Sequence, residues 1–288
     1  NTTGASNTSV GAYALDATTT GNDNTAMGVN ALTSNTTASN NTAVGVNSLN
    51  ANTTGTRNSA IGRGSLQTNT TGDYNTANGY NALSSNTTAD YNTALGYTAG
   101  AAITTGQQNT LVGGMAGNAI TEGDYNVGVG IWAAGSTTTA DGNTAVGYSA
   151  LYPNTTGAHN TAIGRNSLGS NTSASNNVAV GYNSLTANTT GHSNTAVGKD
   201  AGIAITTGIS NTIIGLDAGD AITTAEENCG LGENALGGVT TGGLNIGIGS
   251  AAGTNTTATT TGVRNIFIGT YAHGSAADAN DEIVIGKS

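Results

Sequence analysis

Residues 24–40 read NTAMGVNALTSNTTASN, and residues 41–57 read NTAVGVNSLNANTTGTR. Aligned without a gap, the two segments agree at most positions, so the chain repeats with a period of 17 residues. The opening residue of this unit is Asn at position 7 and at every seventeenth position up to 245. The next units open at Asn265 and Glu282. A fixed period of this kind is the sequence signature of a repeat architecture.

The columns of the repeat predict a parallel β-solenoid (β-roll). We number the opening residue of each unit 0. Position 1 is mostly Thr, position 3 is apolar in every unit except at Asn78, and position 4 is always Gly. β-branched residues favour strands, and Asn-Thr-Thr-Gly at positions 11 to 14 favours a turn. Because 17 residues are too few for a helical repeat, we predict an all-β chain of about 17 coils, each with two short strands and two turns.

We predict a single continuous array over residues 1–288. Residues 1–6 match the end of a preceding coil, and residues 254–262 contain a three-residue insertion, because the step from Asn245 to Asn265 is 20. The exposed ends of a solenoid need caps or continuation. No polar cap is visible at either end, so we expect an excerpt from a longer fibre.

The apolar residues at position 3 are expected to form the core. Under the two-residue alternation of a strand, positions 1 and 3 share one face, and Ala at position 2 shares the other with Gly at position 4. The predicted core residues are Val44, Ile61, Leu95, Val146, Ile163, Val197, Ile214 and Ile268.

Positions 8 and 11 compensate for each other. Position 8 is usually Leu, and position 11 is then usually Asn, whereas four units carry Gly at 8 and Ile at 11. One large apolar side chain is thus exchanged for another, and both are predicted to fill the same core volume. A fifth glycine, Gly253, has no matching Ile. The four exchanged pairs are Gly100 with Ile103, Gly117 with Ile120, Gly202 with Ile205, and Gly219 with Ile222.

Identical residues should stack coil on coil, about 4.8 Å apart. The Thr and Asn columns are therefore expected to form hydrogen-bonded ladders. Several position-11 Asn residues also match the Asn-x-Ser/Thr glycosylation pattern, which we interpret as turn asparagines. They are Asn35, Asn52, Asn69, Asn86, Asn154, Asn171 and Asn188.

Composition and charge exclude several function classes. The net charge is −10 and the six Lys and Arg residues form no run, whereas a nucleic-acid-binding protein shows a basic stripe. No stretch of about 18 apolar residues could span a membrane. Cys229 has no partner in the chain, which excludes a disulfide framework. The three His residues lie on different coils, so we predict no catalytic, metal or cofactor site and no enzymatic activity.

Runs such as residues 143–151, NTAVGYSAL, and 177–185, NVAVGYNSL, resemble the repeats of bacteriophage tail-fibre proteins. More distantly, they resemble the head repeats of YadA-like trimeric autotransporter adhesins, although the coils of those heads are shorter. The resemblance implies a trimeric β-roll that serves in attachment, extracellular, on a cell surface or on a virion. It also implies that the small face of positions 2 and 4 packs between three rolls.

Candidate contacts with a partner or receptor are the exposed aromatic and apolar residues. Position 5 varies between charged residues and Tyr, which indicates solvent exposure, and stacked Tyr side chains could bind sugar rings. Met115 and Trp132 lie one period apart at position 6, beside Ile131. The candidate set is Tyr80, Tyr97, Met115, Ile131, Trp132, Tyr148 and Tyr182.

Three functions remain open on these grounds. The first is a segment of an attachment fibre, a homotrimer with a surface for a cell-surface glycan or protein receptor. The second is a self-assembling filament subunit that joins end to end. The third is an ice-binding solenoid, which is disfavoured because Thr36 and Thr37 in one coil are adjacent and should face opposite ways.

Overall fold

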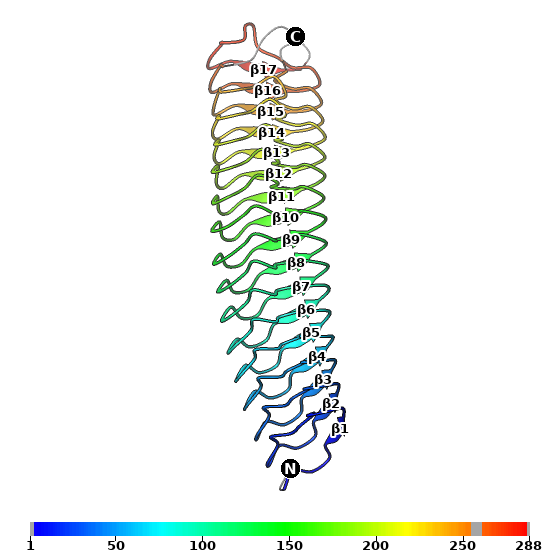
Figure 1. Ribbon diagram of the computed structural model, residues 1–288. Coiled ribbons are helices and arrows are strands. Elements are labelled where there is room, and N and C mark those ends of the chain that lie inside the picture. The colour runs from blue at the N-terminus through cyan, green and yellow to red at the C-terminus, as the bar shows by residue number, and fades with distance from the viewer. Residues whose placement is uncertain (1–2, 255–260, 287–288) are drawn as a thin grey trace. The chain divides into compact units, whose positions relative to one another are not determined.

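The computed structural model describes residues 3–254 and 261–286. The chain forms two compact units, Asn1–Gly142 (unit 1) and Asn143–Ser288 (unit 2). In each unit the chain winds into successive coils, and each coil contributes one three-residue strand at positions 1 to 3 of the repeat (Figure 1). The described residues contain no helix. The predicted all-β, parallel β-solenoid fold is confirmed.

The strands of both units have the same length. In unit 1 they are β1 (Thr8–Val10), β2 (Thr25–Met27), β3 (Thr42–Val44), β4 (Ser59–Ile61), β5 (Thr76–Asn78), β6 (Thr93–Leu95), β7 (Thr110–Val112) and β8 (Val127–Val129). In unit 2 they are β9 (Thr144–Val146), β10 (Thr161–Ile163), β11 (Val178–Val180), β12 (Thr195–Val197), β13 (Thr212–Ile214), β14 (Cys229–Leu231), β15 (Ile246–Ile248), β16 (Ile266–Ile268) and β17 (Ile283–Ile285).

Strand pairing within each unit follows the repeat. Each strand pairs in parallel with the strand of the next coil, and identical repeat positions face each other, as Thr25 faces Thr42. In unit 2, Ile246 faces Ile266, so the predicted insertion leaves the strand register intact. Residues 255–260, where most of that insertion falls, lie outside the described residues. Continuity of the array from unit 1 into unit 2 stays a prediction.

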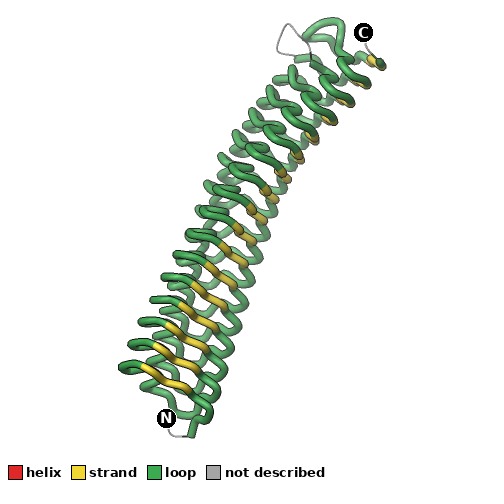
Figure 2. The backbone as a smooth tube through the Cα atoms, turned by 90° about the vertical axis from the view of Figure 1, so that its right-hand side faces the viewer, coloured by secondary structure: helices red, strands yellow, loops and turns green. Residues whose placement is uncertain are grey.

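The prediction of two strands per coil is wrong, because each described coil has one. Figure 2 shows the strands along one side of the coils, with turns elsewhere. The second apolar column, position 8, adopts left-handed backbone conformations: φ is 50° at Leu32 and 47° at Leu49. Such values are unusual for a bulky residue and are incompatible with a strand. Position 8 therefore belongs to a turn that directs its side chain into the coil.

The core lies on the opposite face of the strand from the predicted one. Position 2 points inward, and Ala26, Ala43 and Ala60 are fully buried together with the position-8 leucines. Position 3 points outward, so its assignment to the core is wrong. In the isolated chain Ile61, Leu95, Ile163 and Ile268 are exposed, and Val44, Val146, Val197 and Ile214 are half-buried.

The exchange between positions 8 and 11 is confirmed. Ile205 is fully buried, and a Cβ atom added to Gly202 would lie 2.9 Å from the Cδ1 atom of Ile205. The isoleucine thus occupies the space next to position 8 that a leucine fills in other coils. Gly253 has a different partner, since an added Cβ would lie 2.9 Å from Cδ2 of Phe267 at position 2 of the next coil.

Two columns of buried asparagines join successive coils. At position 11, Nδ2 of Asn52 donates to Oδ1 of Asn35 (3.2 Å), and Nδ2 of Asn69 donates to Oδ1 of Asn52 (2.9 Å). At position 0, the backbone N–H of Asn41 donates to Oδ1 of Asn24 (3.0 Å). Buried amides need such partners, so the predicted asparagine ladder is confirmed and runs in two columns.

Threonine forms a third ladder, as predicted. The position-12 hydroxyl of Thr53 donates to the carbonyl of Thr70 in the next coil (3.0 Å), and the same bond recurs along both units. Position 4 brings the backbones closest, because a Cβ on Gly181 (φ 138°) would lie 2.2 Å from the carbonyl oxygen of Gly198. Only glycine fits there.

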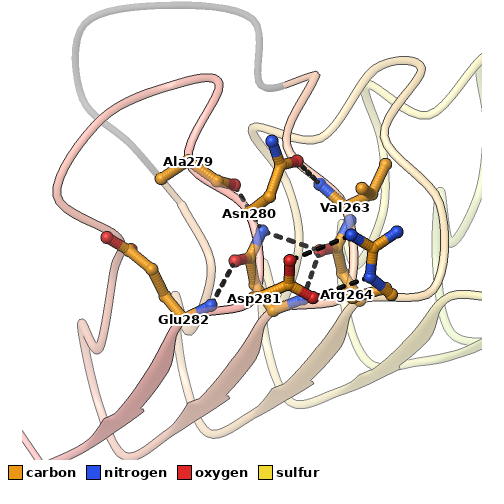
Figure 3. A network of polar contacts seen from close by, with 8 residues as sticks. Val263, Arg264, Ala279, Asn280, Asp281 and Glu282 are labelled. Carbon is orange, nitrogen blue, oxygen red and sulfur yellow. Dashed lines mark hydrogen bonds and ion pairs between the residues drawn. The ribbon is translucent and has the colours of Figure 1, made fainter.

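The turn edge of the coils is also joined by side chains, as Figure 3 shows for unit 2. The backbone N–H of Val263 donates to Oδ1 of Asn280 (2.8 Å). Arg264 donates through Nε and Nη2 to the two carboxylate oxygens of Asp281 (2.7 and 2.9 Å). Its guanidinium lowers the pKa of the Asp281 carboxyl. Positions 15 and 16 thus hold neighbouring coils in line.

Candidate interaction surfaces

In each unit the outer side of the strands forms an uncharged surface, which we call the strand face. It consists of positions 1 and 3 of each strand: position 1 is Thr, Ser, Val, Cys or Ile, and position 3 is Val, Ile, Leu or Met except at Asn78. The exposed fraction is 42% for Ile61, 46% for Leu95 and 39% for Ile163. Large apolar side chains therefore lie in a row on the surface of the isolated chain.

The composition of the strand face changes along unit 2. Position 1 is Thr in β9 and β10 but Ile in β15, β16 and β17, so the face becomes wholly apolar there. Each strand has three residues with a rise of about 3.3 Å per residue, so the strip is about 10 Å wide. Unit 2 has nine strands spaced about 4.8 Å apart, so its strip is about 40 Å long. The strip of unit 2 alone, its Thr side chains included, therefore covers about 400 Å², within the range of the largest apolar patch on a typical monomer.

A second surface is the column at position 5. In unit 1 the rings of Tyr80 and Tyr97 stack with their centroids 5.5 Å apart, and the guanidinium of Arg63 lies 5.7 Å from the Tyr80 ring. In unit 2 the guanidinium of Arg165 lies between Tyr148 (5.9 Å) and Tyr182 (5.7 Å). The structure therefore brings the predicted tyrosines together in pairs, with arginine as a cation–π partner.

This stacking changes what the tyrosines can bind. Tyr80 lies between Arg63 and Tyr97, and Tyr148 and Tyr182 each have one ring face against Arg165. A sugar ring stacks on an open aromatic face, so these columns do not form the continuous sugar platform that the sequence suggested. The same holds for Tyr74 and Tyr91 at position 16, which stack at 4.8 Å with an interplanar angle of 5°.

In unit 1 the column of side chains at position 5 is interrupted beside Tyr97. After Tyr97 the column continues with Gly114, and no atom apart from its chain neighbours lies within 4 Å of the place where a Cβ of Gly114 would be. Ile131, 52% exposed, follows in the next coil. We call the gap between Tyr97 and Ile131, with Gly114 as its floor, the Gly114 notch. Two coil spacings of about 4.8 Å leave room in it for one flat ring.

The other two candidate residues flank the notch but are less exposed than expected. Met115 and Trp132 are both half-buried. Their backbones are held by neighbouring coils, since the N–H of Met115 donates to Tyr97 and that of Trp132 donates to Gly114. Together with Ile131 they make an apolar rim beside the tyrosine column.

The possible glycosylation sites are structural. The position-11 asparagines that match the pattern are fully buried, and their amide nitrogens donate to the preceding coil or to the position-14 carbonyl of the same coil. A glycan on any of them would replace one of the two amide hydrogens and would find no space in the folded coil. The interpretation as turn asparagines agrees with this placement.

The aspartates of the interrupted column at position 15 accept hydrogen bonds from backbone N–H groups of the preceding coil. Oδ1 of Asp90 accepts from the N–H of Asp73 (2.7 Å), and Oδ1 of Asp141 accepts from the N–H of Asp124 (2.8 Å). Across the described ranges, no three His, Cys, Asp or Glu side chains gather as metal ligands would. Of the histidines, His192 contacts Ser193 and His273 contacts the carbonyl of Gly274.

One cluster in unit 2 was not predicted from the sequence. A hollow of about 470 Å³ is lined in part by Asp220, Asn234, Tyr271 and His273, which come from positions 9, 6, 6 and 8 of three coils. Burial, and then the nearby Asp217 carboxylate, raise the pKa of Asp220. The hollow differs from the rest of the surface because it gathers groups of different chemistry rather than a column of one kind.

Nothing in the described part of the chain is a helix long and apolar enough to cross a membrane. No model of a known protein family matches this chain, and no curated protein matches it significantly.

Proposed function

We propose that the chain is a non-enzymatic segment of an extracellular or virion-borne attachment fibre, and that it assembles as a parallel homotrimer through its strand faces. The observation that carries this proposal is the exposed apolar row at position 3. Burying apolar surface stabilises by about 25 cal/mol per Å², so a strip of this size favours association. The likeness of the repeats to those of tail fibres and adhesin heads supports the attachment role.

The shape of the strand face suits a threefold axis. The strip is only two outward side chains wide, so three copies can turn it toward a common axis, where residues of the same row come together. Parallel chains related by rotation place identical residues at the same height. This arrangement replaces the interface expected from the resemblance, since position 2 is buried within the coil.

The receptor contact is assigned to the Gly114 notch in unit 1. It offers an open aromatic face on Tyr97 and an apolar wall on Ile131, a combination suited to one ring of a glycan. Glycan binding should be lost in Tyr97→Ala and kept in Tyr182→Ala, because Tyr182 lies in unit 2 and takes no part in the notch.

The assembly is tested by the mass of the purified chain in light scattering. We expect a discrete trimer, and we expect Ile163→Asp on the strand face to dissociate it. The matched control is Leu216→Asp at position 5 of the same unit, since Leu216 is 42% exposed but lies off the strand face. A monomeric wild-type chain, or a trimer that tolerates Ile163→Asp, would overturn the proposal.

Two other outcomes would point to other functions. A monomer that shows thermal hysteresis would favour ice binding, because position 1 carries a row of Thr in unit 1. An open-ended polymer whose length grows with concentration would favour the self-assembling filament.

A further inference from the structure

A repetitive interface has a register problem. The strand face repeats with each coil, about every 4.8 Å. Two copies that slide past each other by one coil would meet nearly the same side chains, so the apolar rows alone do not fix the relative height of the chains. Weakly specified registers of this kind are prone to slip.

Asn78 is the exception in the row. It ends strand β5, and its neighbours at position 3 are Ile61 in β4 and Leu95 in β6. Every other strand in the structure carries Val, Ile, Leu or Met at this position. Asn78 is exposed, and its side-chain amide forms no hydrogen bond within the described residues. The amide is therefore available to a group outside the chain.

We propose that Asn78 sets the axial register of the homotrimer; this rests on the proposed assembly. With the chains aligned, three Asn78 amides lie at one height around the axis and can donate to and accept from one another. After a slip of one coil, each amide would face Ile61 or Leu95 of a neighbour and lose its partners. A single polar residue in an apolar interface specifies register in coiled coils by the same mechanism, at some cost in stability.

The asparagine is not needed by the coil itself. Its side chain points away from the core, and Val is the commonest residue at position 3. Asn78→Val is therefore expected to fold and to trimerise. Because it removes a polar group from an apolar interface, it should also raise the melting temperature while loosening the register.

Disulfide cross-linking between two labelled chains reads the register directly. In a Cys229→Ser background, one chain carries Thr25→Cys and the other carries Thr42→Cys. Both sites are at position 1, where cysteine occurs naturally at Cys229. The two chains are refolded together and oxidised. Disulfides between equal sites report aligned chains, and disulfides between Cys at 25 and Cys at 42 report a slip of one coil.

We expect equal-site disulfides to dominate when Asn78 is present. In Asn78→Val the proportion of mixed-site disulfides should rise at least about tenfold, because one unpaired buried amide already shifts an equilibrium by about that factor. The control is Thr93→Val, which also removes a polar group from the strand face but at a position where neighbouring coils repeat Thr. It should leave the proportion unchanged.

The outcomes separate this inference from the proposed assembly. Trimers in which Asn78→Val keeps the wild-type proportion of mixed-site disulfides would overturn the role of Asn78 and leave the assembly standing. A chain that light scattering shows to be monomeric would overturn both.

Discussion

The exchange between positions 8 and 11 makes a sharp prediction about the core. In the coil of β12, Gly202 and Ile205 can be replaced by the Leu and Asn found in other coils. Gly202→Leu alone should overpack the core, because even its Cβ would lie 2.9 Å from Cδ1 of Ile205 and 3.1 Å from Cδ2 of Leu185. Ile205→Asn alone should leave a void where a fully buried side chain was.

The double variant should recover most of this loss. The leucine fills the space vacated by Ile205, and Leu185 already adopts the same left-handed conformation (φ 51°) in the preceding coil. The amide of the new asparagine can donate to Oδ1 of Asn188, which is buried without a hydrogen bond at the end of its ladder. Extending the ladder by one coil would supply that donor.

The magnitudes follow from known core substitutions. In Gly202→Leu, overpacking costs about 1–3 kcal/mol. In Ile205→Asn, loss of the buried isoleucine costs about 2–5 kcal/mol, and the new hydrogen bond to Asn188 returns about 1 kcal/mol. The double variant should keep only the cost of leucine in a left-handed conformation, about 1–2 kcal/mol. The coupling between the two sites should therefore be at least about 2 kcal/mol in the stabilising sense.

Equilibrium unfolding in urea measures this coupling. The four proteins of the cycle should be compared at one protein concentration, since association shifts apparent stability, and their m values should agree. If the double variant is as unstable as the sum of the two single variants, positions 8 and 11 do not share one core volume and the reasoning is refuted.

Three further predictions concern the backbone, the ladders and the turn edge. Gly181→Ala should lower the free energy of unfolding in urea by about 2–4 kcal/mol, because its Cβ would lie 2.2 Å from the carbonyl oxygen of Gly198. Gly114→Ala, where the space is open, should change it by less than about 0.5 kcal/mol. Equal effects of the two substitutions would contradict the close packing at position 4. Asn52→Ala should cost about 2–4 kcal/mol by the same assay, since it leaves buried groups unpaired on both sides, and a neutral result would show that the ladder is dispensable. Arg264 lowers the pKa of Asp281, so their pairing stabilises the folded chain above the unfolded carboxyl pKa of about 4, and this stabilisation is lost as the pH falls through the folded pKa. The urea midpoint of the wild-type chain should therefore fall more steeply below about pH 4 than that of Asp281→Asn. Parallel pH profiles of the two proteins would contradict this.

The repeat length predicted the stacking of coils and their register, because a fixed period leaves only one alignment of neighbours. It did not predict which side of the strand faces inward. Alternation separates position 2 from position 3, but both columns are apolar, so the pattern alone does not orient them. Size suggests that Val and Ile belong inside, whereas the turn at position 8 already fills the core with leucine and leaves room only for Ala at position 2.

The pairing of residues at positions 2 and 8 within the chain could have shown which side of the strand faces inward. Leu111 and Ile213 at position 2 lie against the position-8 glycines of their own coils, Gly117 and Gly219, and Phe267 lies against Gly253 of the preceding coil. No comparable exchange involves position 3. The single strand per coil was harder to foresee, because leucine is rarely found with positive φ, and here the stacked neighbours hold it there.

The candidate contacts were predicted only in part. Variation at position 5 identified the exposed tyrosines, but the stacking of Tyr80 on Tyr97 depends on coil geometry that the sequence does not contain. The Gly114 notch could have been inferred from the missing side chain in that column. The strand face was missed because its residues were assigned to the core.

The central claim, that the strand face is buried between copies of the chain, is tested most directly at the single native cysteine. Cys229 occupies position 1 of β14 and is half-buried in the isolated chain. Reaction with a maleimide should be slow in the native protein and fast in the dissociated Ile163→Asp variant, and mild oxidation of the native protein should give covalent dimers. Equally fast labelling of both proteins, with no cross-linked dimer, would contradict the claim.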